Sequence, residues 1–185
     1  MKKILLVLFS LTLIFSCASD NSGSEDNASA VFKGKINGEF FEANTISNSN
    51  LIHQTNGATQ GAVLTFYSEN DQYKFTFAIA EHDNDSNCMG EGDYRNSDTS
   101  NREVIIWISY KFNGNTYQVH FPDDDSPFDT TEFAKVTNCN NNKISGEFSG
   151  TYTKDSDFEG VTESTPQTIS LTEGVFENIE FNVVN

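Results

Sequence analysis

The sequence predicts an all-β fold: a single antiparallel β-sandwich or barrel of about 8–10 strands, after a cleaved signal peptide and a flexible tether. Short runs in which apolar and polar residues alternate recur from residue 31 onward, with turn-forming residues between them. No long stretch has the spacing of an amphipathic helix. These observations indicate the fold class and leave the choice between sandwich and barrel open.

Two hairpins organise the predicted strands. The first turns at Asn37-Gly38, because Asn-Gly accepts the positive φ angles of a type I′ turn. The second covers residues 103–121 and turns at Asn113-Gly114. In its first arm, Ile105 and Trp107 alternate with a second apolar set. We therefore expect a central strand with both faces covered.

Six further alternating runs are expected to be strands. They cover residues 62–67, 72–80, 133–139, 143–153, 167–171 and 175–183. Sixteen phenylalanines are available to fill the core between these strands.

The first thirty residues carry a targeting signal. Two lysines precede an apolar run, Ile4–Phe15, that has the length of a signal-peptide core and is short for a membrane span. The run ends in Ile14-Phe15-Ser16-Cys17, which resembles the lipobox of bacterial lipoproteins. The resemblance implies that residues 1–16 are removed and that Cys17 carries a diacylglycerol, which would hold the mature chain on a membrane. An ordinary secretory signal, with Cys17 incidental, is the alternative.

Residues 17–30 are expected to tether the lipid to the β domain at residues 31–185. The segment is small and polar, so it cannot bury enough surface to fold. Its acids, Asp20, Glu25 and Asp26, resemble the signal that sends lipoproteins to the outer face of the outer membrane in Bacteroidota. We expect an outer-membrane location, at the cell surface or otherwise on the periplasmic face. A merely solvated tether is the alternative reading of these acids.

The composition limits the partners. The chain has 27 Asp and Glu against 11 Lys and Arg, a formal net charge of −16. Such a surface repels phosphate backbones, so we expect no nucleic-acid partner. The expected partners are the membrane, through the lipid on Cys17, and an outer-membrane protein complex.

Both ends of the β domain carry a recurring arrangement of glycines and aromatics. At the start, two strands of residues 32–41 flank an Asn-Gly turn; near the end, Gly-x-Phe occurs at Gly146-Glu147-Phe148 and again within residues 173–179. This arrangement resembles the small all-β outer-membrane lipoproteins of unknown function from Bacteroidota. The resemblance implies an envelope location and a β fold, and it supplies no activity and no catalytic residues.

The sequence shows no catalytic or metal-binding motif. His53, His82 and His120 are scattered and lack the spacing of a zinc site. Asp155–Gly160 resembles the opening of a calcium loop, but Pro166 stands where such a loop needs a bidentate Glu. We read this segment as an acidic hairpin tip and expect no catalytic residue, no metal and no cofactor.

Two short acidic segments are also interpreted as loops, and a third short segment resembles a modification signal. Asp123–Asp125 and residues 82–85 are read as solvated loops. Asp129-Thr130-Thr131 resembles the short O-glycosylation signal of exported Bacteroidota proteins, a match that also arises by chance.

The remaining cysteines predict a disulfide. If Cys17 carries lipid, Cys88 and Cys139 are left, and the compartment outside the inner membrane is oxidising. Two thiols allow one intramolecular pairing. We therefore predict a Cys88–Cys139 bridge that fixes a turn-rich loop to the end of a strand; two free thiols are the alternative.

Three functions are consistent with these features. The first is a non-enzymatic interaction or structural subunit at the outer membrane. The second is a ligand-binding β-barrel with an apolar or glycan pocket, to which Trp107 and Tyr110 would contribute. A hydrolase is the third.

Overall fold

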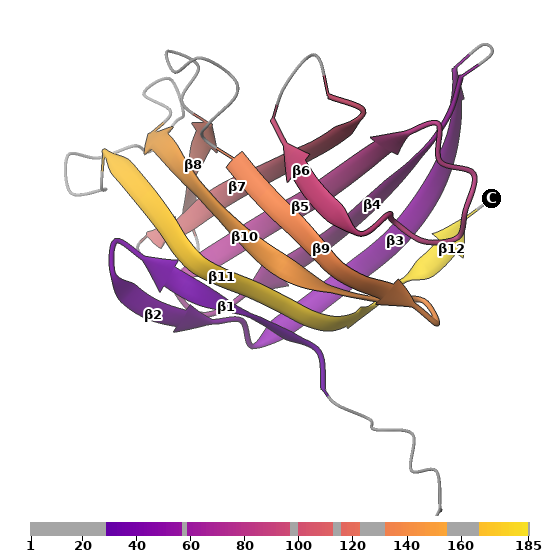
Figure 1. Cartoon of the computed structure of the whole chain (residues 1–185). Coiled ribbons are helices and arrows are strands. Elements are labelled where there is room, and N and C mark those ends of the chain that lie inside the picture. The colour runs from indigo at the N-terminus through magenta and orange to yellow at the C-terminus, as the bar shows by residue number, and fades with distance from the viewer. Residues whose placement is uncertain are drawn as a thin grey trace, which may run out of the picture.

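The protein is a two-layered β structure. The computed structural model describes residues 29–56, 59–96, 100–112, 116–122, 132–154 and 167–184. All regular elements in these ranges are strands, and the two layers pack face to face as a sandwich (Figure 1). The predicted all-β fold class is confirmed.

Twelve strands occur in the described residues, compared with the expected 8–10. They are β1 (Val31–Ile36), β2 (Glu39–Glu42), β3 (Thr45–Asn56), β4 (Thr59–Glu69), β5 (Tyr73–His82), β6 (Gly92–Arg95), β7 (Arg102–Phe112), β8 (Thr116–Pro122), β9 (Glu132–Asn140), β10 (Lys143–Lys154), β11 (Thr168–Glu180) and β12 (Asn182–Val184).

Figure 1 shows one layer in front of the other. The back layer has the strand order β12-β3-β4-β5-β7-β8, and the front layer has β6-β9-β10-β11-β1-β2. Neighbouring strands are antiparallel except β12, which lies parallel to β3. β8 pairs with β7 and also with the end of β10, so it joins the two layers along one side.

Local sequence explains the turn and the bulge that shape the β1–β2 and β11 region. Asn37 and Gly38 both have positive φ angles, 50° and 86°, which confirms the predicted turn. The runs at 167–171 and 175–183 were expected to be two strands, but β11 continues through the residues between them. Glu173 has a φ of 52° there, and the register of β11 against β10 shifts nearby, so the break is a bulge rather than a turn.

Phenylalanine rings fill the space between the layers. Phe32 of β1 stacks on Phe148 of β10 with ring centres 4.5 Å apart. Across the sandwich, Phe32 also lies 5.1 Å from Phe75 of β5. Within the back layer, Phe66 of β4 stacks on Phe77 of β5 at 4.8 Å. Because both layers contribute rings to one cluster, their burial is the main force that holds the layers together.

The expectation that both faces of β7 are covered was wrong. Val104, Ile106 and Ile108 point into the core and are buried. On the opposite side, Ile105 is 40% exposed and Trp107 is 45% exposed. Alternation in β7 therefore places one apolar set in the core and another on the surface.

Candidate functional site

The outward side of the back layer carries a surface whose one charged position, Glu103 opposite Ala80, lies at a corner; we call the uncharged residues of this surface the charge-free face. Its residues occupy three successive register positions across β12, β3, β4, β5 and β7. They are Val184, Ile52, Val63 and Ala80; Asn182, Asn50, Thr65, Ala78 and Ile105; and Ser47, Tyr67, Thr76 and Trp107. In a chain with a net charge of −16, a continuous uncharged surface of this kind is a candidate contact surface.

The strand β5, between β4 and β7, carries only small side chains on the charge-free face. These are Thr76, Ala78 and Ala80 of β5. Register places Trp107 beside Thr76 on one side, with Tyr67 beside Thr76 on the other. The small side chains of β5 therefore form a low strip, which larger apolar and aromatic side chains of β4 and β7 border.

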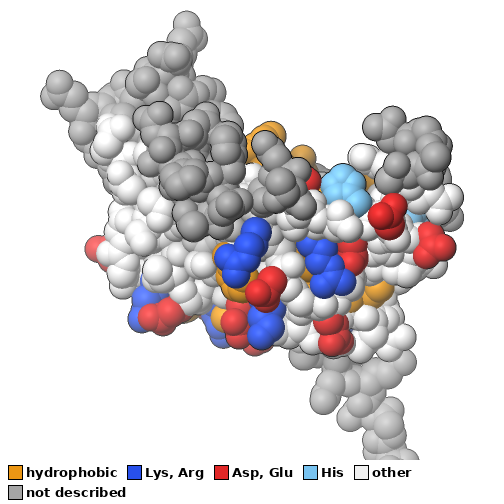
Figure 2. Space-filling model, turned by 45° about the horizontal axis from the view of Figure 1, so that its top comes forward, with side chains coloured by type: hydrophobic (Ala, Val, Ile, Leu, Met, Phe, Trp, Pro, Cys, Tyr) orange, Lys and Arg blue, Asp and Glu red, His pale blue; other side chains and the backbone are white. Residues whose placement is uncertain are grey.

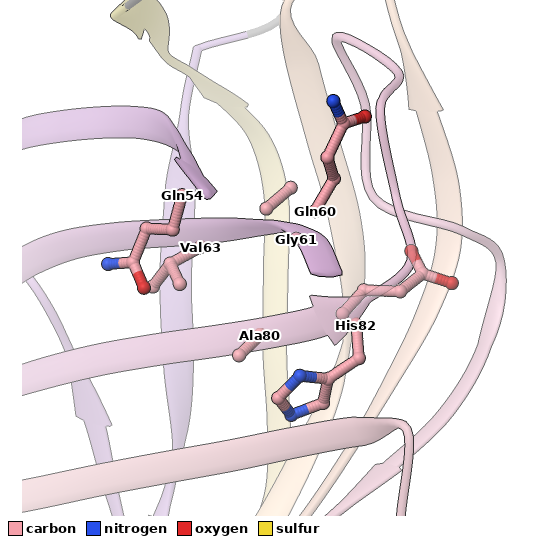
Figure 3. A pocket seen from close by; sticks show the side chains of 8 residues that line it. Gln54, Gln60, Gly61, Val63, Ala80 and His82 are labelled. Carbon is pink, nitrogen blue, oxygen red and sulfur yellow. The ribbon is translucent and has the colours of Figure 1, made fainter. Parts of the chain in front are cut away.

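A hollow of about 250 Å³ lies at one end of the charge-free face (Figure 3). Gly61 of β4 stands in register between Gln54 of β3 and His82 of β5, so the missing side chain leaves this space open. Figure 3 shows Val63 and Ala80 between the Gln54 and His82 side chains. The His82 Nε2 atom lies 3.3 Å from Oε1 of Glu103, which borders the face. The hollow therefore offers amide and ring groups at the edge of an apolar surface, and Glu81 also contributes to its lining.

A second hollow, of about 280 Å³, lies at the other end of the charge-free face. It is lined by Ser47, Asn48, Tyr67, Glu69 and Lys74. The Lys74 Nζ atom lies 5.6 Å from the centre of the Tyr67 ring, a cation–π contact at the border of the face. Charged groups thus begin where the face ends.

The opposite side of the sandwich has a different surface. Figure 2 shows basic and acidic side chains interspersed on the side of the molecule that it presents. Lys35 of β1 pairs with Glu173 of β11 at 2.7 Å, and both side chains are exposed. Exposed pairs of this kind contribute little to stability, so they mainly keep the surface solvated. The two outward surfaces of the sandwich therefore differ in charge.

A polar network fixes the loop between β5 and β6. Arg102 Nε and Nη2 each lie 2.7 Å from Glu81 Oε1, and the Gly90 N–H and Asn84 Nδ2 donate to Glu81 Oε2. Partial burial alone would raise the pKa of Glu81, but these donors outweigh burial and hold the pKa below its ordinary value. The carboxylate is ionised and accepts hydrogen bonds from all of these donors, so its role is to stabilise the loop.

The predicted disulfide is confirmed. Cys88, in the same loop, is bonded to Cys139 near the end of β9, with their Cα atoms 5.8 Å apart. Both cysteines pack against the core. The bridge fixes the loop to the front layer, as expected.

A buried carboxyl lies deeper in the sandwich. Glu132, the first residue of β9, is 1% exposed. Its Oε1 accepts the Ile106 N–H at 2.6 Å, and its Oε2 accepts Asn96 Nδ2 at 2.9 Å. β8 pairs with β7 only from Ile108 onward, so the Ile106 N–H would otherwise have no acceptor on that edge.

Burial raises the pKa of Glu132 to about 7, although the Ile106 and Asn96 donors act in the opposite direction. The neighbouring Tyr152 is fully buried, and its hydroxyl makes no hydrogen bond of standard geometry within the described residues. Burial and the nearby Glu132 charge raise the pKa of Tyr152 as well. A carboxyl this deep does not touch a dissolved substrate, so we assign it a structural role.

The structure separates the histidines that the sequence singled out. His53 Nε2 lies 3.4 Å from Asn87 Oδ1, whereas His82 lies beside Glu103. Across the residues that the structure describes, no group of three His, Cys, Asp or Glu side chains is placed to hold a metal ion.

Other predicted features lie outside the described residues. They are Cys17 with its signal peptide and most of the tether, Asn113-Gly114, Asp123–Asp125, Asp129–Thr131, and the loop Asp155–Gly160 with Pro166. The side chains of Tyr110 and His120 are also outside the description.

Sequence reasoning missed both the charge-free face and Glu132. A signal for the face was present, because the outward residues of 62–67 and 75–80 lack charge. Joining them to Ile105 and Trp107 requires the strand register. Nothing in the sequence around Glu132 marks it as buried.

No helix in the described ranges is long and apolar enough to span a membrane.

Comparisons with known proteins supply no relative. No protein-family model, curated protein or solved structure matches the chain.

Proposed function

We propose that this chain is a lipid-anchored outer-membrane protein that acts by binding, as a non-enzymatic interaction or structural subunit. The anchor rests on the lipobox-like residues 14–17 and on the polar tether that follows. The charge-free face is its contact surface, and this face is the observation that carries the proposal.

Two observations support binding on the outside of the fold. Phenylalanine rings fill the described interior, so a ligand has its best access at the outward face. The described carboxyls with perturbed pKa values already have structural partners or are inaccessible: Glu81 is held by Arg102, and Glu132 is buried. The proposal therefore rests on surface recognition rather than on acid–base chemistry.

A photo-crosslinking residue placed in the native envelope tests the proposal. We expect Ile105 on the charge-free face to give a discrete adduct when it is replaced by such a residue. The matched control is Glu147, which is exposed on the outward side of β10 in the front layer. Adducts from both positions, or from neither, would contradict a specific contact surface.

A further inference from the structure

We propose that the ligand of the charge-free face is a neutral polysaccharide, bound as an extended chain across the strands of the back layer. The inference rests on the proposed function, because it names what that contact surface recognises. Charge, size and the chemistry of the side chains each support this ligand class.

Charge does not favour an ionic ligand. The three register positions hold one charged residue, Glu103, which pairs with Ala80 at the β7 edge, and the neighbouring Glu69 and Lys74 carry opposite signs. A phosphate, sulfate or uronate ligand would meet no complementary charge in the middle of the face. A neutral ligand with apolar patches loses little solvation there.

The size of the face favours a narrow ligand. Five strands about 4.8 Å apart, with three outward positions about 7 Å apart, give a surface of roughly 24 by 20 Å, on the order of 500 Å². A stable protein–protein interface buries about 800 Å² on each partner. The face is therefore small for a stable partner protein or for a second copy of this chain, and it is large enough for several sugar rings.

The aromatic side chains suit the apolar faces of sugar rings. A pyranose ring presents C–H groups on its faces and hydroxyls around its rim, so its face packs on an aromatic ring while its rim hydrogen-bonds. Trp107 and Tyr67 stand at one register position with Thr76 between them. They are two strands apart, about 10 Å, which is comparable to the spacing of alternate rings in an extended glycan.

Lys74 contacts one side of the Tyr67 ring, and uncharged polar groups lie on the rest of the face. Thr76 and Thr65 place hydroxyls on the face itself, and Asn50 adds an amide. The hollow at Gly61 adds the amides of Gln54 and Gln60. A few oriented polar groups around an apolar floor are what a carbohydrate site needs for specificity.

The single tryptophan makes the test direct. Trp107 is the only tryptophan of the chain, so tryptophan emission reports on the charge-free face alone. The mature chain, purified in a detergent without a sugar headgroup, is titrated with hydroxyethylcellulose, galactomannan, xyloglucan, laminarin, mannan and dextran. Polygalacturonate and chondroitin sulfate are the charged comparisons. We expect at least one neutral polymer to shift the emission to the blue and to protect Trp107 from acrylamide quenching, and neither charged polymer to do so.

Two matched variants locate the site. Thr76→Glu places a charge between Tyr67 and Trp107 on the face, and Thr151→Glu makes the same change at an exposed position of β10 in the front layer. We expect the first to weaken polymer binding at least about tenfold and the second to leave it unchanged, because only the first buries a charge under the glycan. Circular dichroism checks that both variants are folded.

The outcomes separate this inference from the proposed function. Three results would overturn the assignment of a neutral glycan as the ligand. They are no response to any neutral polymer, a preference for a charged polymer, and equal binding by the two threonine variants. A protein adduct from position 105 in cells would keep the contact surface and replace the glycan with a protein partner. The absence of any adduct from that position would count against the contact surface itself.

Discussion

Replacing the buried carboxyl by its neutral isostere should make the protein more stable at neutral and alkaline pH. Glu132 has a pKa of about 7 in the folded protein, compared with 4.5 for an ordinary Glu. Between these values the folded state keeps a proton that the unfolded state has lost, so stability falls as the pH rises through this window. Above about pH 7, the folded protein instead holds a buried charge.

The magnitude follows from the two pKa values. A difference of about 2.5 units corresponds to about 3 kcal/mol, because each unit is worth about 1.4 kcal/mol. Glu132→Gln has no proton to lose and retains a carbonyl oxygen for the Ile106 N–H; the Asn96 amide can rotate to accept from the new amide group. The free energy of unfolding of the variant, relative to wild type, should therefore rise by about 3 kcal/mol between pH 4.5 and about pH 8.

Urea unfolding followed by circular dichroism, with the disulfide intact, measures this difference at each pH. Glu147→Gln, an exposed change of the same type on β10, controls for the pH dependence of the many other acids. If the curves for wild type and Glu132→Gln stay parallel between pH 4.5 and pH 8, the pKa of Glu132 is not raised by burial. The reasoning about that site would then be refuted.

Three further predictions concern the anchor and the fold. Cys17→Ala should release the mature chain from membranes or leave the precursor uncleaved; unchanged detergent partitioning and unchanged mobility would contradict lipidation. Replacing both Cys88 and Cys139 by Ala should lower the free energy of unfolding by about 4 kcal/mol, because the bridge closes a loop of 51 residues; denaturant unfolding checks this, and a loss below about 1 kcal/mol would show that the bridge constrains little. Gly174→Ala should lower the thermal midpoint, because a Cβ at this position would overlap the backbone and ring of Phe148; an unchanged midpoint would mean that the bulge adjusts without strain.

Local signals in the sequence were sufficient for part of the fold. The Asn37-Gly38 turn follows from the φ angles that these two residues accept, and the Cys88–Cys139 bridge follows from there being one pairing of two thiols. The alternation in residues 72–80 predicted β5, whose Phe75 and Phe77 are buried as expected. In each case the signal is carried by neighbours in the chain.

Other elements depend on pairing that the sequence does not display. β3 begins with the run Thr45–Asn50, which is polar except for Ile46 and resembles a loop, yet its backbone pairs with β4 and the inward Leu51 is fully buried. The Thr172–Gly174 segment resembles a turn, yet pairing on both sides carries β11 through it as a bulge. Backbone hydrogen bonds to neighbouring strands override weak local preference in both cases.

The charge-free face could be predicted only in fragments. Ile105 and Trp107 were recognised as a second apolar set, but their exposure depends on whether another layer covers β7. The face itself joins residues from Ser47 to Val184 through the register of five strands. Long-range register of this kind has no local signature.

The most direct test of the central claim compares cysteine labelling in cells and in purified protein. Thr76→Cys places a thiol on the charge-free face, and Thr151→Cys places one on the outward side of the front layer. For each variant, the rate of modification by a thiol reagent in intact envelopes is divided by the rate in the purified chain. A bound partner predicts a ratio at least about tenfold lower for Thr76→Cys than for Thr151→Cys, because only the face is covered. Equal ratios would contradict the claim that the charge-free face is the surface by which this protein binds.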